Sequence, residues 1–295
     1  MPVEIFVPFW GDPDLLKETV RSVLAQNNSD WTLTVVDDCY PDDSVAEYFA
    51  GLEDTRVTYV RNATNKGITE NYRTCVALAK YDLMVILGCD DVLLPNYVDV
   101  VLKANRDFPD AAVIQPGVQI IDETGKVVTS LADSVKRRLV GPKTGFATVL
   151  GGESLAVSLL GGNWLYWPSL AFRTDAIRRV SFRDGLPIVQ DLALVMDIVL
   201  QGGSLVYEPA LAFSYRRHSA SASSATLTDG SRFAGDREYA QIAQKLCLDR
   251  GWNKAAFAAR VRWTSRLHAV SLLPTALVSL KPDVIRATLR HAFGS

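Results

Sequence analysis

Leu83-Met-Val-Ile-Leu-Gly-Cys-Asp90-Asp91 is the stretch that decides the fold, because an apolar run of strand length ends there in two adjacent carboxylates. A second run, Leu33-Thr-Val-Val-Asp37-Asp38, repeats the arrangement. Short apolar runs rich in β-branched residues are typical of strands buried on both faces of a parallel sheet. Acids that follow such strands lie at the carboxyl edge, where open α/β folds bind ligands. The alternative is that each pair is an ordinary helix cap or turn.

Strand and helix patterns alternate through residues 1 to about 125. Val3-Glu-Ile-Phe-Val7 predicts the first strand, and Asp12-Pro13 supplies a cap and a first-turn proline for the helix that follows. This alternation predicts a mostly parallel sheet with right-handed crossovers. No G-x-G-x-x-G follows the first strand and no P-loop motif is present, so the sequence disfavours both dinucleotide-binding and P-loop sites.

The composition is that of a globular α/β protein. The chain has 295 residues, 48% of them hydrophobic and 22% charged, and no apolar run reaches the roughly 18 residues that span a bilayer. The N-terminus shows no export signal, and the four cysteines lack metal or disulfide spacing, which indicates a reducing compartment. We therefore expect a cytoplasmic protein.

The charge is unevenly distributed along the chain. From Arg250 onward there are eight basic residues and one acid, a net +7 that leaves −9 for residues 1–249 of the total of −2. Such a helix-prone basic segment suits an anionic membrane surface, and the alternative is a solvated helix face. The acidic body disfavours nucleic acid as a partner.

Beyond residue 129 the alternation weakens. The tract around residues 161–168 is rich in aromatic residues, and residues 166–173 predict a further strand. Two short strands are expected over 205–207 and 211–215. The stretch Ser219–Asp229 consists largely of serine, alanine and threonine, which predicts a mobile loop suited to a lid. Residues 231–293 are predicted to be helical.

Taken in order, these motifs resemble the family 2 glycosyltransferases with the GT-A fold over roughly residues 3–220. The motifs that carry the resemblance are Val7-Pro8-Phe9-Trp10, Ser22-Val-Leu-Ala-Gln26, Val35-Val-Asp37-Asp38, Asn65-Lys66-Gly67, Leu87-Gly-Cys-Asp90-Asp91, Gln190-Asp191 and Tyr215-Arg216-Arg-His218. The resemblance implies a mostly parallel nucleotide-binding sheet flanked by helices. It also implies a domain over 1–220, with a nucleotide-binding half of about 1–125 and an acceptor-binding half of about 126–220. Residues 221–295 would form a mobile loop and a helical C-terminal extension.

In such enzymes a divalent cation stabilises the nucleotide diphosphate that leaves. The resemblance makes Asp90 the direct ligand of Mn²⁺ or Mg²⁺, with Asp91 in support and His218 as a third ligand. A histidine after a strand is alternatively a solvated polar residue. The first acid of the family's Asp-x-Asp motif is replaced here by Gly88, which puts the affinity for metal in question.

The remaining donor contacts also follow from the resemblance. Asp38 would accept a hydrogen bond from the nucleobase, with a UDP-sugar favoured. Simple packing is the alternative for Phe9, and Arg217 is the alternative to Arg216 as a phosphate contact. The other residues expected to bind the nucleotide sugar are Pro8, Phe9, Trp10, Asn65, Lys66, Gly67 and Arg216.

Inversion at the sugar requires a base that removes the proton of the acceptor hydroxyl. Asp191 matches the family's catalytic aspartate, although its usual glutamate companion is Gln190 here, and a helix N-cap is the competing interpretation. Trp164, Tyr166 and Trp167 are candidate acceptor contacts, and the alternative is that they are core residues.

The sequence therefore predicts an inverting glycosyltransferase that uses a UDP-sugar in cell-surface polysaccharide synthesis. The acceptor would be a saccharide or a lipid-linked molecule, reached at the inner face of the membrane. One alternative, motivated by Gly88 and Gln190, is an inactive nucleotide-sugar binding protein. Another is a sugar nucleotidyltransferase, although Phe9-Trp-Gly-Asp-Pro is not the glycine-rich basic loop that such enzymes carry.

Overall fold

The computed structural model describes residues 2–129, 141–186, 189–217, 231–278 and 282–293. Its first half alternates strands and helices as the sequence predicts. In chain order these are β1 (Val3–Phe9), α1 (Pro13–Leu24), β2 (Trp31–Asp37), α2 (Ser44–Ala50), β3 (Val57–Arg61), α3 (Ile68–Leu78), β4 (Leu83–Ile86), β5 (Val92–Leu93), α4 (Tyr97–Asp107) and β6 (Val113–Ile121).

The second half is mostly helical and adds three strands. Its elements are β7 (Thr148–Leu150), α6 (Gly152–Gly161), a 3₁₀ turn (Trp167–Ser169), β8 (Ala171–Arg173), α7 (Thr174–Arg178), α8 (Gln190–Leu200), β9 (Leu205–Arg216), α10 (Ser231–Asp249), α11 (Asn253–Val261), α12 (Trp263–Val278) and α13 (Pro282–Phe293).

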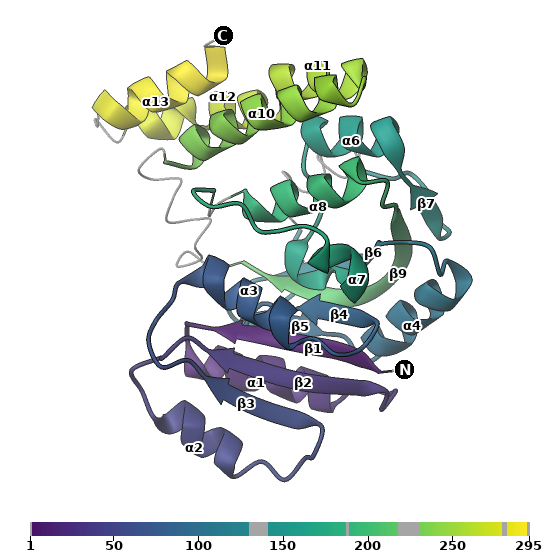
Figure 1. The fold of residues 1–295 in the computed structure, drawn as a ribbon. Helices are drawn as coiled ribbons and strands as arrows, with labels where there is room; N and C mark the ends of the chain where they lie inside the picture. Colours follow the sequence, from purple (N-terminus) through teal and green to yellow (C-terminus); the bar gives the residue numbers. More distant parts are fainter. Residues whose placement is uncertain (1, 130–140, 187–188, 218–230, 279–281, 294–295) are drawn as a thin grey trace.

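All nine described strands belong to one sheet, in the order β3-β2-β1-β4-β8-β6-β9-β5, with β7 also paired to β9. The pairs β1–β2, β1–β4, β2–β3 and β6–β9 are parallel. The short strand β8 runs antiparallel to β4 and to β6 on its two sides. The neighbouring strands β3, β2, β1 and β4 are therefore parallel, and β8 separates them from the parallel pair β6 and β9 (Figure 1).

Alternating side chains of the central strands build two separate cores. Ile5 and Val7 of β1 face a core formed with α1, α2 and α4, whereas Phe6 faces the opposite core with α3, α6, α7 and α8. β4 repeats the division, with Val85 on the first side and Met84 on the second. Successive side chains of a strand point to opposite faces, so a continuous apolar run buries both sides of the sheet.

One expectation for the second half is wrong in detail. The predicted strands 205–207 and 211–215 form a single strand, β9, that pairs with β6 along its whole length, with register shifts at Pro116/Gly117 and Gly117/Val118. Gly117 permits the close approach, because a Cβ there would lie 2.5 Å from the carbonyl oxygen of Pro209. The predicted strand 166–173 is only partly a strand, since a 3₁₀ turn precedes β8. The predicted lid, Ser219–Asp229, lies outside the described residues.

The C-terminal helices form a layer that packs on the second core. α11 contacts α6, and α10 contacts α8, so this layer lies on the far side of those helices from the sheet (Figure 1). Ala243, Cys247, Ala255 and Ala259 are buried in the contact. Among the described helices, none combines the length and apolar character that crossing a membrane requires.

Candidate active site

The candidate site residues gather at one edge of the sheet. β1, β2 and β4 are parallel, and β6 runs in the same direction because both β4 and β6 are antiparallel to β8. β9 is parallel to β6, so its C-terminal end lies at this edge as well. The segments that follow Phe9, Asp37, Ile86, Ile121 and Arg216 therefore meet, as expected for a ligand site of an open α/β sheet.

The carboxylate of Asp38 fastens a neighbouring loop to the end of β2. Its Oδ1 accepts hydrogen bonds of 2.9 Å from both the Asn62 side-chain amide and the Lys66 backbone N–H. Its Oδ2 accepts one of 2.8 Å from the backbone N–H of Gly67, which has a φ of +83°. Asp38 is almost fully buried, whereas Asn65 and Lys66 are exposed. Asp38 thus positions the loop that the sequence predicts at the donor, in addition to any contact of its own.

Trp10 and Tyr40, which we call the aromatic wall, follow β1 and β2 at the same edge of the sheet. Trp10 is 53% exposed, and its ring meets the ring of Tyr40 edge-on with centroids 5.5 Å apart. The Tyr40 backbone N–H donates a 2.7 Å hydrogen bond to Asp37, which also accepts from the hydroxyl of Tyr59. Phe9 lies underneath and is fully buried, in agreement with its packing alternative. The wall offers an exposed indole to a planar ligand.

Arg216 has a different place from the one predicted for a phosphate contact. Its backbone N–H donates to Asp91 Oδ1 at 2.8 Å, and its guanidinium Nε donates to the carbonyl of Asp90 at 2.7 Å. Nη1 donates to the carbonyls of Asp122 and Glu123 at 3.2 Å, and Nη2 lies 2.7 Å from Glu18 Oε2. The residue is 2% exposed. These contacts direct the guanidinium into the protein, where it ties four segments together.

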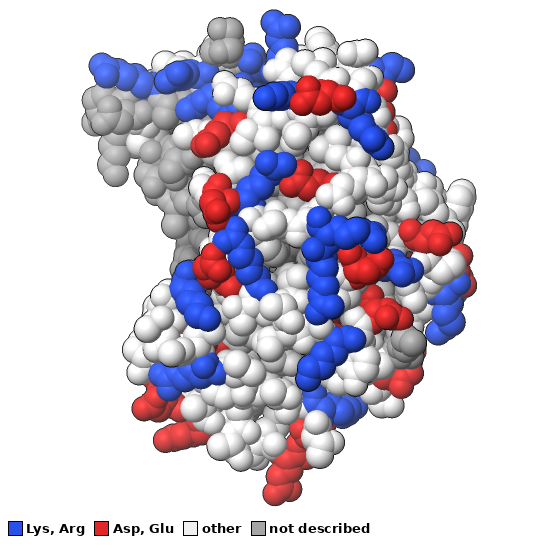
Figure 2. Space-filling model, in the orientation of Figure 1, with Lys and Arg blue, Asp and Glu red and all other residues white. Residues whose placement is uncertain are grey.

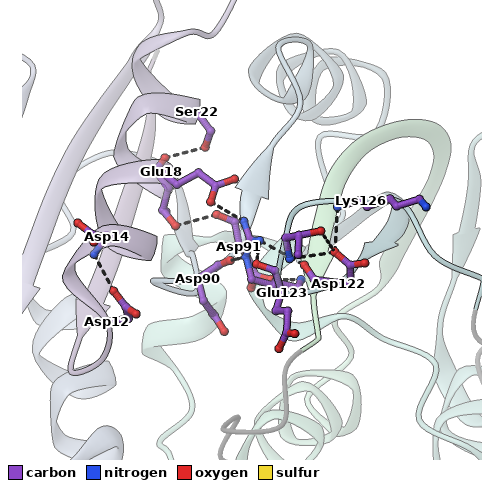
Figure 3. A network of polar contacts seen from close by, with 12 residues as sticks. Asp12, Asp14, Glu18, Ser22, Asp90, Asp91, Asp122, Glu123 and Lys126 are labelled. Atoms are coloured by element: carbon purple, nitrogen blue, oxygen red, sulfur yellow. Dashed lines mark hydrogen bonds and ion pairs between the residues drawn. The ribbon is translucent and has the colours of Figure 1, made fainter.

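The two acids after β4 have different environments (Figure 3). Asp91 is buried within the network of Arg216, and burial together with the charge of Asp90 raises its pKa. The side chain of Asp90 points out of that network and is only half-buried. Asp90 is therefore the acid of the pair that faces the edge of the sheet.

Gly88 leaves room for this arrangement. A Cβ at this position would lie 2.4 Å from Asp91 Oδ2 and 3.1 Å from Asp90 Oδ1. An aspartate in place of Gly88, as in the family's usual motif, would require Asp91 to move and would add a third carboxylate beside two others. The buried carboxylate of Asp91 thus occupies the space that a side chain at position 88 would need.

The donor set around Asp90 suits a hard divalent cation. Mg²⁺ and Mn²⁺ usually take one or two protein carboxylates and complete their coordination with water and substrate phosphates. In the described part of the chain no group of three or more histidine, cysteine or acidic side chains could hold a metal ion. His218, the predicted third ligand, lies outside the described residues. A carboxylate such as that of Asp90 would hold an ion of this kind together with water and substrate phosphates.

Helix α1 holds the segment after the two acids in place. Thr19 Oγ1 donates to the carbonyl of Asp91 at 2.7 Å, and Ser22 Oγ accepts from the Leu93 N–H at 3.1 Å. The side chain of Gln26 donates to the carbonyl of Leu94 at 2.8 Å and accepts from the N–H of Val98 at 3.0 Å. The residues Ser22 and Gln26 of the sequence motif are thus supports of the Asp90 loop.

Asp191 lies at the second residue of α8, and the N-cap of that helix is Val189, so the N-cap interpretation is wrong. The side chain of Gln190 accepts a 2.9 Å hydrogen bond from Thr69 Oγ1 in the first turn of α3. Since α3 begins directly after Gly67, this bond links the start of α8 to the loop held by Asp38. The predicted base is thereby positioned against the predicted donor loop.

Tyr215 lies near the end of β9, beside the segment that carries the two acids after β4. Burial raises its pKa to about 12, and the charges of Asp91, Asp90 and Asp191 all add to the shift. Tyr166 lies against it, with ring centroids 5.4 Å apart. Tyr215 and Tyr166 thus form a half-buried aromatic pair next to the segment that carries the two acids after β4.

Two of the three predicted acceptor contacts are core residues. Trp164 is 7% exposed and donates from its indole to Ser158 Oγ at 2.9 Å, and Trp167 is 8% exposed among Tyr72, Phe172 and Phe182. Large aromatic rings contribute mainly by burial, which is the alternative that the sequence left open. Tyr166 alone of the three is half-buried beside the site.

A family model described as glycosyl transferase family 2 matches residues 4–155, more than half of the chain. The chain belongs to glycosyl transferase family 2. This family 2 chain is 31% identical over 107 residues to WcaA of Escherichia coli, which is named for a glycosyl transferase role in colanic acid biosynthesis. It is 23% identical over 125 residues to EpsE of Bacillus subtilis, also named as a glycosyltransferase. The matched segments cover 36% and 42% of this chain, and 38% of WcaA and 45% of EpsE.

A solved structure of residues 1–349 of S. aureus TarS in complex with UDP-GlcNAc shares the fold. The TM-score is 0.69 at 13% identity, and the match covers 99% of this family 2 chain and 82% of the TarS chain. The same TarS segment in complex with UDP gives a TM-score of 0.67. The predicted GT-A fold is confirmed for this family 2 chain.

Several residues of the site carry no signal in the sequence. Asn62, Thr69 and Tyr40 support the donor loop and the aromatic wall, yet each is an ordinary polar or aromatic residue in a turn or first helical turn. Tyr215 belongs to the motif Tyr215-Arg216-Arg-His218, and nothing in that motif indicates a role for it. Its place becomes evident only when β9 is paired to β6, because this pairing brings its ring beside Tyr166.

Proposed function

We propose that this chain is an inverting glycosyltransferase that moves a sugar from a nucleotide diphosphate sugar, with a UDP-sugar as the favoured donor. The observation that carries the proposal is the hydrogen bond between Thr69 and Gln190, because it joins the start of α8, which carries the proposed base, to the loop at the proposed donor edge of the sheet. The complexes of TarS with UDP-GlcNAc and UDP support the choice of nucleotide.

On the donor side, the nucleobase and ribose would lie against Pro8 and Trp10, with the indole as the stacking face, while the buried ring of Phe9 supports them from beneath. Asp38 holds the loop of Asn65, Lys66 and Gly67 against the nucleotide and has lone-pair capacity left for a base N–H. Asp90, supported by Asp91, would hold Mn²⁺ or Mg²⁺, with His218 proposed as a further ligand. The ion, when bound, offsets the charge that develops on the departing diphosphate.

On the acceptor side, Asp191 would take the proton of the acceptor hydroxyl while that oxygen attacks the sugar from the face opposite the diphosphate. Tyr166 would contact the acceptor, which we propose to be a saccharide or a lipid-linked molecule of cell-surface polysaccharide synthesis. The basic C-terminal region would bring the enzyme to the inner face of the membrane.

A thermal-shift screen tests the donor directly. UDP-GlcNAc, UDP and the corresponding guanosine and thymidine compounds are added with Mn²⁺, with Mg²⁺ or with EDTA. A ligand at about 100 times its Kd stabilises the native state by about 2.7 kcal/mol, which raises the Tm by several degrees. We expect a metal-dependent rise with one nucleotide, followed by transfer or slow hydrolysis of its sugar. Binding with neither reaction would favour the inactive, nucleotide-sugar binding alternative, and no rise with any nucleotide would refute the proposal.

Variants of two neighbouring arginines test a structural role and a donor-binding role separately. Arg216→Met removes the donors that satisfy three carbonyls, so we expect a loss of roughly 2–3 kcal/mol of unfolding free energy. Arg217→Met, at the exposed neighbour, is expected to leave stability unchanged and to weaken donor binding. Urea denaturation and donor titration of both variants check this. Equal stability of the two variants would return Arg216 to the role of a phosphate contact.

A further inference from the structure

Arginines gather where the C-terminal helices meet, away from the donor edge. Arg237 lies on α10, Arg262 at the corner between α11 and α12, Arg266 on α12 and Arg290 on α13. We call these four residues the arginine cluster. Figure 2 shows blue Lys and Arg side chains over the C-terminal layer at the top of the view.

A polar network fastens the helices that carry the cluster. Ser265 Oγ donates to Asp236 Oδ2 at 3.0 Å, so the 2.7 Å contact between Ser265 Oγ and His291 Nε2 uses the proton of the imidazole. Nδ1 of His291 is then the acceptor that faces Arg237 Nη1 at 3.5 Å. His291 is fully buried and links Ser265 of α12 to Arg237 of α10.

The positive charges of the cluster act on one another. Burial lowers the pKa of Arg237, and the charge of Arg290 lowers it further. Burial likewise lowers the pKa of Arg262, with the charges of Arg266 and Arg237 in the same direction. Among the described residues, Asp236 is the one acid whose charge opposes both shifts. The other charges that act on Arg237 and Arg262 are those of arginines.

Arg262 has a nitrogen in its guanidinium group that is unsatisfied within the described part of the chain. Its Nη1 is buried and has no hydrogen-bond partner among the described residues. Its φ of +48° lies in the left-handed region that favours glycine, and it caps the C-terminus of α11. The chain thus keeps an arginine in a conformation that glycine adopts more easily.

Buried cations are normally paired, and guanidinium groups match phosphate oxygens through two parallel hydrogen bonds. We propose that the arginine cluster binds a phosphate or diphosphate group, which enters at the exposed side of Arg290. This site is built from α10 to α13, whereas the proposed donor site lies at the sheet edge. The inference therefore stands independently of the proposed transferase reaction.

Calorimetric titration of the full chain with inorganic pyrophosphate tests the site. EDTA and constant ionic strength suppress binding through a metal at Asp90. We expect saturable binding to the wild type, weakened at least tenfold by Arg262→Gln and by the milder Arg290→Gln. Arg260→Gln, an exposed arginine of the same layer, is the matched control and should bind as the wild type does, as should Asp90→Asn.

The Tm provides a second measurement, which distinguishes loss of the site from general destabilisation of the protein. In a buffer free of phosphate, Arg262→Gln should melt at or above the Tm of the wild type, because it relieves repulsion. With saturating pyrophosphate the order should reverse, because only the wild type gains from the anion. An unchanged order in both buffers, or no binding of pyrophosphate by the wild type, would overturn the proposal.

The origin of the phosphate is settled by a second pair of probes. Vesicles containing phosphatidic acid present the group on a lipid, and phosphatidylserine vesicles of equal charge serve as the control. Flotation with phosphatidic acid that is competed by pyrophosphate would assign the site to a lipid headgroup. Binding of pyrophosphate without flotation would assign it to a soluble phosphate. Flotation that is equal with both lipids and unaffected by Arg262→Gln would contradict a phosphate site.

Discussion

Asp191→Asn should reduce transfer by about 10²- to 10⁴-fold and leave donor binding intact, because the amide cannot accept the proton of the acceptor hydroxyl. The substitution keeps the size of the side chain and its place in the first turn of α8. The measurement is single-turnover transfer from the donor found by thermal shift, compared with the Tm rise caused by the same donor.

Asp197→Asn, further along the same helix, is the control for this prediction. Asp197 pairs with Arg183 at 2.7 Å, so its loss should cost stability and leave transfer per folded molecule unchanged.

Gln190→Glu adds the acid that the family usually places beside the base. We expect the added charge to raise the pKa of Asp191, and so to shift the rising limb of the pH–rate profile to higher pH. Full activity of Asp191→Asn would place the base elsewhere.

Asp90→Asn should abolish the metal-dependent part of donor binding. An amide oxygen is a weaker ligand than a carboxylate for a hard cation, and Asp91 is held by the N–H of Arg216. We expect the Tm rise with donor and Mn²⁺ to fall to the value seen in EDTA, and transfer to fall by at least about 10³-fold. Mn²⁺ electron paramagnetic resonance in the presence of UDP gives a reading that does not depend on turnover.

Glu123→Gln is the matched control for Asp90→Asn. The side chain of Glu123 lies in the same network region and points to the same side as that of Asp90 (Figure 3). Its carbonyl supports Arg216, and this contact survives the substitution. We expect Glu123→Gln to keep the metal-dependent rise in Tm. If Asp90→Asn keeps that rise as well, the proposed metal site is wrong.

The positions of the acids could be predicted because they depend on strand order alone. A parallel sheet brings the residues after β2 and β4 to one edge whatever the loops do, so Asp38 and Asp90 are brought together by the alternation of strands and helices. The two-sided burial of Phe6 and Ile5 follows in the same way from a continuous apolar run.

The roles of Arg216 and of the two tryptophans could not be predicted in this way. Whether an arginine at a strand end points to solvent or into the protein depends on the carbonyls of the segment after β6 and on Glu18, which are distant in sequence. Likewise, Trp164 and Trp167 are buried by α6 and by side chains such as Phe182, contacts that arise from tertiary packing. The sequence pattern alone is compatible with either a buried or an exposed side chain at each of these positions.

The position of β8 between β4 and β6 has a consequence for protein engineering. The strand β8, from the second half of the chain, completes the hydrogen bonding of β4 and β6 from the first half, and β9 in turn covers the far edge of β6. A chimera that exchanges the second half of the chain as a block would therefore cut through the middle of the sheet. Recombination that aims at a new acceptor should instead graft short loops at the carboxyl edge and keep every strand with its original neighbours.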